Sequence, residues 1–221
     1  MKMLKELSKK LFEILNVDAY IKKVDELEKR CKRLNNSTRL RLLNICKESL
    51  QFQEIRRNEP LRIALIKTLI ALVPDSNIII ESLINKKSDQ YFYEVHFSLF
   101  CFLDQLHQLK GGKKLAYKVP FLIEQYLFNV KSNAGNAAWM AGDLLGDHWP
   151  LEESLPVLLK SAKNSRFIAG RSSALHGIEE ALRKIETSKK KKILMLLKEI
   201  YKTDRSSKIK TYSKIILDNN L

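Results

Sequence analysis

Apolar residues recur every three or four positions along almost the whole chain, which is the period of an amphipathic helix. Near the beginning, Leu4, Leu7, Leu11 and Leu15 follow this spacing. No useful length of sequence alternates strictly between apolar and polar residues, as a half-buried strand would. We therefore predict an all-α fold. Its helices are expected near residues 2–15, 18–34, 37–52, 59–73, 76–86, 89–109, 114–130, 134–146, 150–163, 166–184, 188–202 and 206–218.

Capping and helix-breaking residues support these boundaries. A serine hydroxyl can accept a hydrogen bond from a free amide in a first helical turn, so we expect N-caps at Ser37, Ser76 and Ser88. Proline is tolerated in a first turn, where we place Pro60, and it ends a helix elsewhere. Further breaks are expected at Pro74, Gly111, Gly112, Gly146 and Pro150. Such short loops favour antiparallel helical hairpins.

The second half of the chain repeats itself. Residues 171–175 (Arg-Ser-Ser-Ala-Leu) match residues 205–209 (Arg-Ser-Ser-Lys-Ile) at an offset of 34, and the Ala-Gly pair at 141–142 lies 35 positions before the His-Gly pair at 176–177. Each of these helices is followed by a leucine-rich one. Small residues on the first helix of a pair allow close approach to the next pair, and the second helix fills the layer between them.

A motif at residues 137–147, Ala-Ala-Trp-Met-Ala-Gly-Asp-Leu-Leu-Gly-Asp, is followed by Leu-Pro-Val-Leu-Leu at 155–159. This combination resembles a HEAT-type helical repeat, with small residues on the first helix and an apolar second helix. The resemblance is best at 134–163 and extends through 166–202. It implies an α-solenoid fold and no particular chemistry.

The resemblance weakens toward the beginning of the chain. Residues 59–86 match only the opening of the motif, and residues 1–58 have the helical pattern without the motif. We expect one α-helical repeat domain over 1–221, with divergent helices at 1–58 and HEAT-like hairpins at 59–221. The expected architecture is a right-handed α-solenoid of antiparallel helical hairpins.

Composition agrees with a helical globular chain. The 221 residues are 45% hydrophobic, and 7 glycines with 5 prolines are too few for the turns of an all-β fold. The net charge of +15 is concentrated at two ends: 15 basic and 8 acidic residues at 1–58, and 12 basic and 3 acidic residues at 183–214. Basic ends can bind nucleic acid, an acidic protein or an anionic membrane, or they can be solvated surface.

Several classes of site and location are disfavoured. Cys31, Cys46 and Cys101 form no CxxC pair, so reduced thiols in a cytoplasmic protein are expected. The first residues contain no uncharged signal-peptide core, and the most apolar stretch, 61–73, is too short and too charged to span a membrane. No histidine pairs with another His or Cys at metal-ligand spacing. We expect no cofactor, no metal and no catalytic residue.

Three of the four histidines have an expected setting. His96 and His107 lie in an aromatic-rich helix and are expected to be partly buried. His176 precedes Glu179 and Glu180 on one helix, where a surface ion pair is the simplest interpretation.

An aromatic and acidic cluster is the first candidate binding site. Trp139 and Asp143 are four positions apart on one predicted helix face, and Trp149 follows the turn. Two tryptophans and a carboxylate could hold a base or a cation. In this general sense the chain is similar to helical-repeat DNA glycosylases, without a residue-by-residue match. The alternative is that the aspartate caps a turn and the tryptophans pack between repeats.

A lysine stripe is the second candidate. Lys190, Lys191, Lys198 and Lys202 are predicted to lie on the helix at 188–202, where the last three form a stripe opposite apolar residues. Such a stripe could bind an acidic surface by charge, with steep salt dependence. It could equally be a solvated helix face.

Together these features favour a non-enzymatic protein that binds a macromolecule. A stacked array is rigid and offers a large concave face lined by second helices, which lowers the ordering cost of an interface. We expect an adaptor or inhibitor, such as an immunity protein that neutralises a toxin, with an acidic protein partner. The alternative is a basic nucleic-acid-binding module, including a HEAT-like DNA glycosylase. The oligomeric state does not follow from the sequence.

Overall fold

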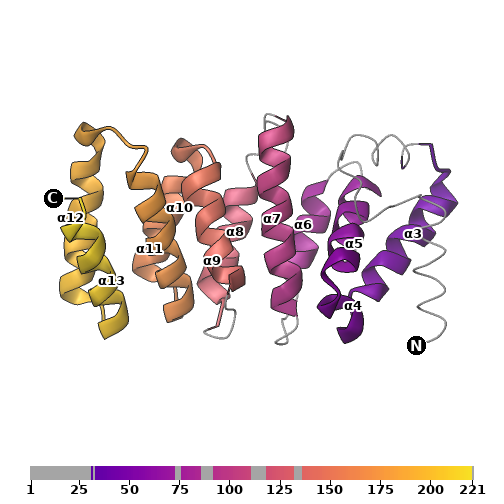
Figure 1. Cartoon of the computed structure of the whole chain (residues 1–221), viewed down its shortest axis with the longest axis horizontal. Coiled ribbons are helices and arrows are strands. Elements are labelled where there is room, and N and C mark those ends of the chain that lie inside the picture. Colours follow the sequence, from indigo (N-terminus) through magenta and orange to yellow (C-terminus); the bar gives the residue numbers. More distant parts are fainter. Residues whose placement is uncertain are drawn as a thin grey trace. The chain divides into compact units, whose positions relative to one another are not determined.

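The computed structural model describes residues 31, 33–72, 76–85, 92–110, 118–131 and 136–220, and every regular element in them is helical (Figure 1). These elements are α3 (Asn36–Ser49), α4 (Gln53–Arg57), α5 (Glu59–Leu72), α6 (Ser76–Ile84), α7 (Phe92–Lys110), α8 (Val119–Asn129), α9 (Asn136–Asp143), the π-helix η2 (Leu144–His148), α10 (Leu151–Asn164), α11 (Ile168–Leu182), α12 (Thr187–Thr203) and α13 (Ser207–Asp218). The all-α prediction is confirmed for these residues. The helix predicted at 2–15 and most of the one at 18–34 lie outside them.

Three local predictions are wrong. Ser37 does not cap α3; the helix begins one residue earlier, and Asn35 caps it by accepting a hydrogen bond from the Thr38 amide at 2.8 Å. The predicted helix at 37–52 ends at Ser49, and the short α4 follows it. Gly146 does not break the chain, because it lies inside η2, which continues α9 as far as His148.

The chain forms two compact units, Met1–Phe102 and Leu103–Leu221. The prediction of one repeat domain over the whole chain stays a prediction. In the first unit, α3, α4 and α6 each pack against α5. The core contribution of α5 comes from fully buried aliphatic side chains: Leu65, Ile66, Leu69 and Leu72.

His96 is buried in the first unit, as predicted, with 1% of its surface exposed. Its Nε2–H donates to the Leu83 carbonyl at 3.0 Å, and the rings of Phe92 and Phe100 surround the imidazole. Burial lowers the pKa of His96 to about 4, because charging the ring in this apolar pocket would cost solvation energy. The side chain of His107 lies outside the described residues.

The second unit consists of two layers of helices. The first helices of successive pairs, α9, α11 and α13, lie side by side, and the second helices α8, α10 and α12 form the other layer (Figure 1). Helix α11 packs on α10, and α13 packs on α12. Each layer therefore buries one face of the other.

Polar bonds between neighbouring pairs join residues 33 to 37 positions apart. The Ser173 hydroxyl donates to the Ala138 carbonyl, 35 positions away. The Lys163 ammonium donates to Glu199 at 2.8 Å, 36 positions away. These separations match the offset of 34 to 35 seen in the sequence. Neighbouring copies of the sequence pattern are therefore neighbours in space.

Glycines allow the first helices to approach closely. A Cβ atom on Gly177 of α11 would lie 2.6 Å from the Gly142 carbonyl oxygen and 2.7 Å from Leu158 Cδ2. A Cβ on Gly146 would collide with the backbone of Gly177. Gly146 therefore serves helix packing, which explains why its predicted role as a breaker is wrong.

The three cysteines are free. Cys31 and Cys46 are buried and Cys101 is half-buried, and burial raises the pKa of Cys46 to about 12. Within the described ranges, no helix has both the length and the apolar character needed to cross a bilayer.

Candidate functional site

An open cavity of about 620 Å³ lies on the first helices of the second unit. We call it the hollow. Its lining comes from three consecutive first helices, α9, α11 and α13. The lining residues are Ala138, Trp139, Ile168, Ala169, Ser172, Ser173, Ser207, Lys208, Thr211, Tyr212 and Ile215.

The wall of the hollow is mainly apolar. Trp139 is 44% exposed, Ile168 is 42% exposed and Ile215 is 48% exposed. One side chain comes from each of the three helices, so the exposed apolar surface crosses the boundaries between pairs. Single exposed apolar residues are ordinary, but several around one cavity are typical of binding surfaces.

The hollow reaches the amino-terminal ends of its helices. Ile168 and Ala169 are the first two residues of α11, and Ser207 and Lys208 are the first two of α13. Amides in a first turn have no partner within the helix and carry partial positive charge. Phe167 precedes α11 without a side-chain capping bond. Lys208 is the one charged side chain in the lining.

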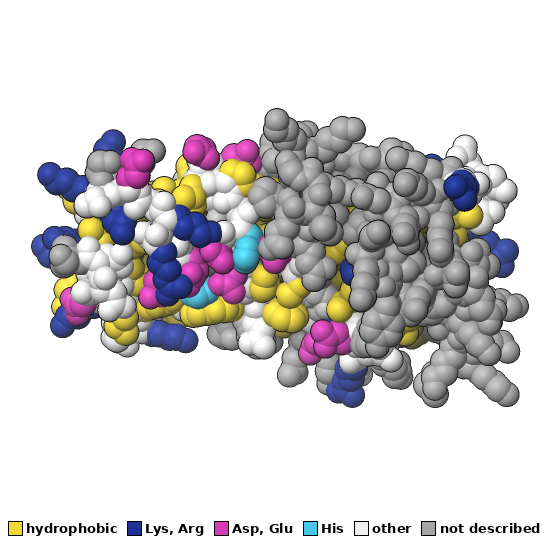
Figure 2. Space-filling model, turned by 45° about the horizontal axis from the view of Figure 1, so that its top comes forward, with side chains coloured by type: hydrophobic (Ala, Val, Ile, Leu, Met, Phe, Trp, Pro, Cys, Tyr) yellow, Lys and Arg dark blue, Asp and Glu magenta, His cyan; other side chains and the backbone are white. Residues whose placement is uncertain are grey.

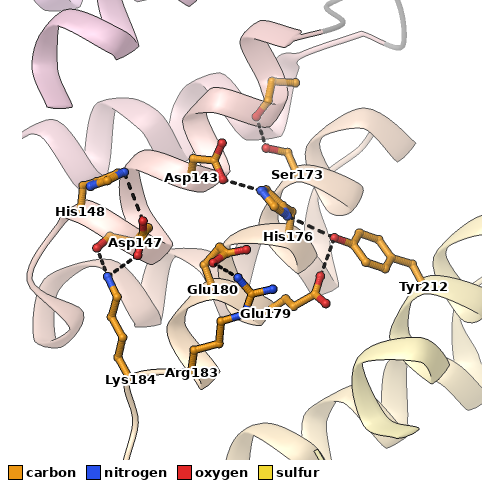
Figure 3. A network of polar contacts seen from close by, with 11 residues as sticks. Asp143, Asp147, His148, Ser173, His176, Glu179, Glu180, Arg183, Lys184 and Tyr212 are labelled. Atoms are coloured by element: carbon orange, nitrogen blue, oxygen red, sulfur yellow. Dashed lines mark hydrogen bonds and ion pairs between the residues drawn. The ribbon is translucent and has the colours of Figure 1, made fainter. Parts of the chain in front are cut away.

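A polar network beside the hollow links the same three helices (Figure 3). The Trp139 ring stacks on His176 at 3.5 Å between centroids. His176 Nε2 bonds to Asp143, and its Nδ1 lies 3.3 Å from the Tyr212 hydroxyl. That hydroxyl donates to Glu179 at 3.0 Å.

The hydrogens in this network can be counted. Tyr212 has one hydroxyl hydrogen, which goes to Glu179. His176 Nε2 can donate to the Asp143 carboxylate, and the direction of the contact between Nδ1 and the Tyr212 oxygen depends on the tautomer of the ring. Burial, and then the Glu179 charge, raise the pKa of Tyr212, so its phenol stays protonated.

We predict that Tyr212→Phe lowers the free energy of unfolding by about 1–2 kcal/mol, because His176 and Glu179 lose a shared hydrogen-bond partner. Urea denaturation followed by tryptophan fluorescence measures the change. Tyr201→Phe on α12 is the matched control, because the exposed Tyr201 has no comparable network. Equal stability of the two variants would contradict a structural role for the network.

Other acidic groups nearby are also paired. The Lys184 ammonium bonds to Asp147 and lowers the pKa of that carboxyl group. His148 lies 3.2 Å from Asp104. Acidic, basic and histidine side chains accordingly lie beside one another on this face of the second unit (Figure 2). Of these carboxylates, Asp147 therefore has a lysine as its cationic partner.

The structure brings Trp139 and Asp143 together around His176 but separates Trp149 from the predicted aromatic site. Trp139 lines the hollow, but Trp149 is 3% exposed, and its Nε1–H donates to Glu153 at 3.3 Å. Asp143 bonds to His176 and is not part of the lining. The predicted pocket of two tryptophans and a carboxylate is thus not formed, because the chain turns Trp149 into the core after η2.

The predicted lysine stripe faces solvent. Lys191, Lys198 and Lys202 are exposed on α12, while Ile193 and Leu197 on the opposite face are buried. Lys190 is partly exposed on the same helix. None of the four lysines lines the hollow. The two predicted binding features therefore occupy different surfaces.

Four residues of the hollow were not predicted as site residues: Ile168, Lys208, Tyr212 and Ile215. A signal for Tyr212 existed, because Trp139, His176 and Tyr212 succeed one another at spacings of 37 and 36. Aligned copies would have placed these rings on three neighbouring helices. Nothing in the sequence marks Ile168, Lys208 and Ile215 as site residues, and only the packing of the helices brings them to one cavity.

Within the described part of the chain, no group of three His, Cys, Asp or Glu side chains is arranged to hold a metal ion. The chain matches no protein-family model, no curated protein and no solved structure.

Proposed function

We propose that this chain is a HEAT-like, right-handed α-solenoid that works as a non-enzymatic protein-binding module. The bonds between residues 33 to 37 apart support the repeat architecture. So does the ordered contact of α9, α11 and α13 in one layer and of α8, α10 and α12 in the other. An adaptor, or an inhibitor such as an immunity protein that neutralises a toxin, fits this description.

The hollow is the observation that carries the proposal. It exposes Trp139, Ile168 and Ile215 together on a scaffold whose helices are held by close glycine packing. Aromatic and aliphatic side chains around a preformed cavity are the usual anchors of a protein interface. A rigid cavity also spares a partner the cost of ordering it.

The proposed binding face differs from the sequence-based expectation. That expectation placed the partner on the second helices, whereas the hollow belongs to the first helices α9, α11 and α13. The polar groups next to it, Asp143, His176 and Glu179, bond to one another or to Tyr212. They support the wall of the hollow, which is why we propose binding and not catalysis.

Site-specific photocrosslinking in the native host tests the proposal. A benzophenone amino acid replaces Ile168 in the hollow, and a matched variant carries it at Glu152, an exposed position on α10. We expect a discrete protein adduct from position 168 and none from position 152. Equal labelling at both positions, or none at either, would contradict a docking role for the hollow.

A second candidate function is nucleic-acid binding by the lysine stripe. The exposure of Lys191, Lys198 and Lys202 on one helix favours it. Filter binding of duplex DNA and tRNA at two salt concentrations tests it, because phosphate contacts weaken steeply with salt. Retention at low salt, lost when the three lysines become glutamate, would support this candidate. A base-excision activity would further require Asp143 to leave His176.

A further inference from the structure

We infer that the hollow receives an acidic segment of the partner protein, one that inserts an apolar side chain between α9, α11 and α13. This inference rests on the proposed protein-binding function and adds the chemistry of the partner.

The inference that the segment inserts an apolar side chain comes from the apolar residues in the wall of the hollow. Trp139, Ile168 and Ile215 supply exposed apolar surface on three sides of one cavity. The Trp139 ring is fixed by stacking on His176 and so offers a preformed face. A leucine-sized or aromatic side chain that entered the cavity would remove its own surface and theirs from water.

The inference that the partner segment is acidic comes from the charge of the groups that line the hollow. Among the described residues that line the hollow, Lys208 is the one charged side chain, and none is Asp or Glu. The first turn of α11, which has no side-chain cap, adds the partial positive charge of its free amides, whereas Ser206 caps α13 by accepting a hydrogen bond from the Ile209 amide. Three hydroxyl groups in the lining, from Ser172, Ser207 and Thr211, can donate hydrogen bonds to carboxylates.

Three neighbouring acidic side chains, Asp143, Glu179 and Glu180, act on the Tyr212 hydroxyl but are not part of the lining. Asp143 bonds to His176, and Glu179 accepts from Tyr212. Glu180 pairs with Arg183 at 2.7 Å. The nearest acidic position further along α13, Asp218, is not part of the lining. The cavity thus keeps a positive end and an apolar wall, which is complementary to a segment that combines carboxylates with an apolar residue.

A polypeptide fits this cavity better than a nucleic acid. Backbone recognition of nucleic acid needs several cationic contacts along a strand, and the lining contains one lysine and no arginine. Arg171, on the same helix as Ile168, is engaged by Asp204 at 3.0 Å.

Fluorescence anisotropy with short labelled peptides tests the inference. The probes are an oligoglutamate peptide with a central leucine, an oligoglutamate peptide without it, and an oligolysine peptide with the leucine. We expect the first probe to bind the full chain most tightly. Lys208→Glu should weaken it about tenfold or more, because a like charge then faces the carboxylates. A glutamate in the first turn of α13 is compatible with the helix dipole, so this variant should fold.

Matched variants make the result specific. Lys191→Glu makes the same charge change on α12, at an exposed position that does not line the hollow, and should alter affinity less than about twofold, because solvent and salt screen exposed charges. Ile215→Ser should remove the advantage of the leucine probe over plain oligoglutamate. Binding that Lys191→Glu weakens as much as Lys208→Glu would overturn the inference.

Other outcomes separate this inference from the proposed function. A protein adduct at position 168, with no acidic peptide bound, would overturn the inference and leave the docking function standing. If neither a protein adduct at position 168 nor binding of an acidic peptide is observed, both the inference and the proposed docking function are wrong. A short labelled DNA duplex that binds in a Lys208-dependent way, while the peptides fail, would replace the acidic segment with a nucleic acid.

Discussion

Gly177→Ala is expected to destabilise the second unit by about 3 kcal/mol, because the added methyl group overpacks the contact between first helices. Its Cβ would lie 2.6 Å from the Gly142 carbonyl oxygen and 2.7 Å from Leu158 Cδ2. Helix propensity alone predicts the opposite sign, since alanine is favoured over glycine in a helix interior by about 1 kcal/mol. The sign of the change therefore decides between close packing and an ordinary helical glycine.

Tryptophan fluorescence during urea denaturation measures this effect, because both tryptophans, Trp139 and Trp149, belong to the second unit. Thr211→Ala on α13 is the control: an exposed position with a similar gain in helix propensity and no contact to overpack. We expect it to raise stability by up to about 0.7 kcal/mol, the difference in helix propensity between threonine and alanine. A stabilising Gly177→Ala would mean that α9 and α11 are further apart than described.

Acidification is expected to destabilise the first unit through His96. The pKa of the buried ring is about 4 in the folded chain and 6.5 in the unfolded chain. Between these values the unfolded chain binds more protons, so the free energy of unfolding falls as the pH falls from 6.5 toward 4. At 1.36 kcal/mol per pKa unit, the loss reaches about 3 kcal/mol. This contribution is fully present above pH 6.5.

Denaturation at several pH values, followed by far-ultraviolet circular dichroism, measures this dependence. His96→Leu should be less stable at neutral pH, because the Leu83 carbonyl loses its donor. It should also lose the decline between pH 6.5 and 4. Ile66→Val is the control: a smaller change in the same core that lowers stability by about 1 kcal/mol at every pH and keeps the decline. An unchanged decline in His96→Leu would assign the acid sensitivity to other groups.

Much of the helical pattern is local and could be predicted. The amphipathic spacing of α12, with Ile193 and Leu197 inward and Lys191 and Lys198 outward, needs no tertiary information. Cap choice was less predictable, because Asn35 and Ser37 are both good N-cap residues and only the backbone path selects one of them. Gly146 was misassigned because a glycine that ends a helix and one that admits a neighbouring helix look alike in sequence.

The candidate site could be predicted only in part. Trp139 was identified as unusual, and it lines the hollow. Trp149 is also a tryptophan and lies ten positions away. It is buried where Trp139 is exposed, and this difference depends on helix packing, which the local sequence does not reveal. Arg62 gives a similar lesson in the first unit. It interrupts an apolar run and is nevertheless buried, because Ser98 accepts from its Nε–H at 2.7 Å.

The central claim is that a partner enters the hollow beside Trp139. Fluorescence of Trp139 in a Trp149→Phe variant, titrated with the leucine-containing oligoglutamate peptide, tests it most directly. The account predicts a blue-shifted emission and reduced quenching by acrylamide as the exposed indole becomes covered. Anisotropy that reports binding while the emission and quenching of Trp139 stay unchanged would contradict it.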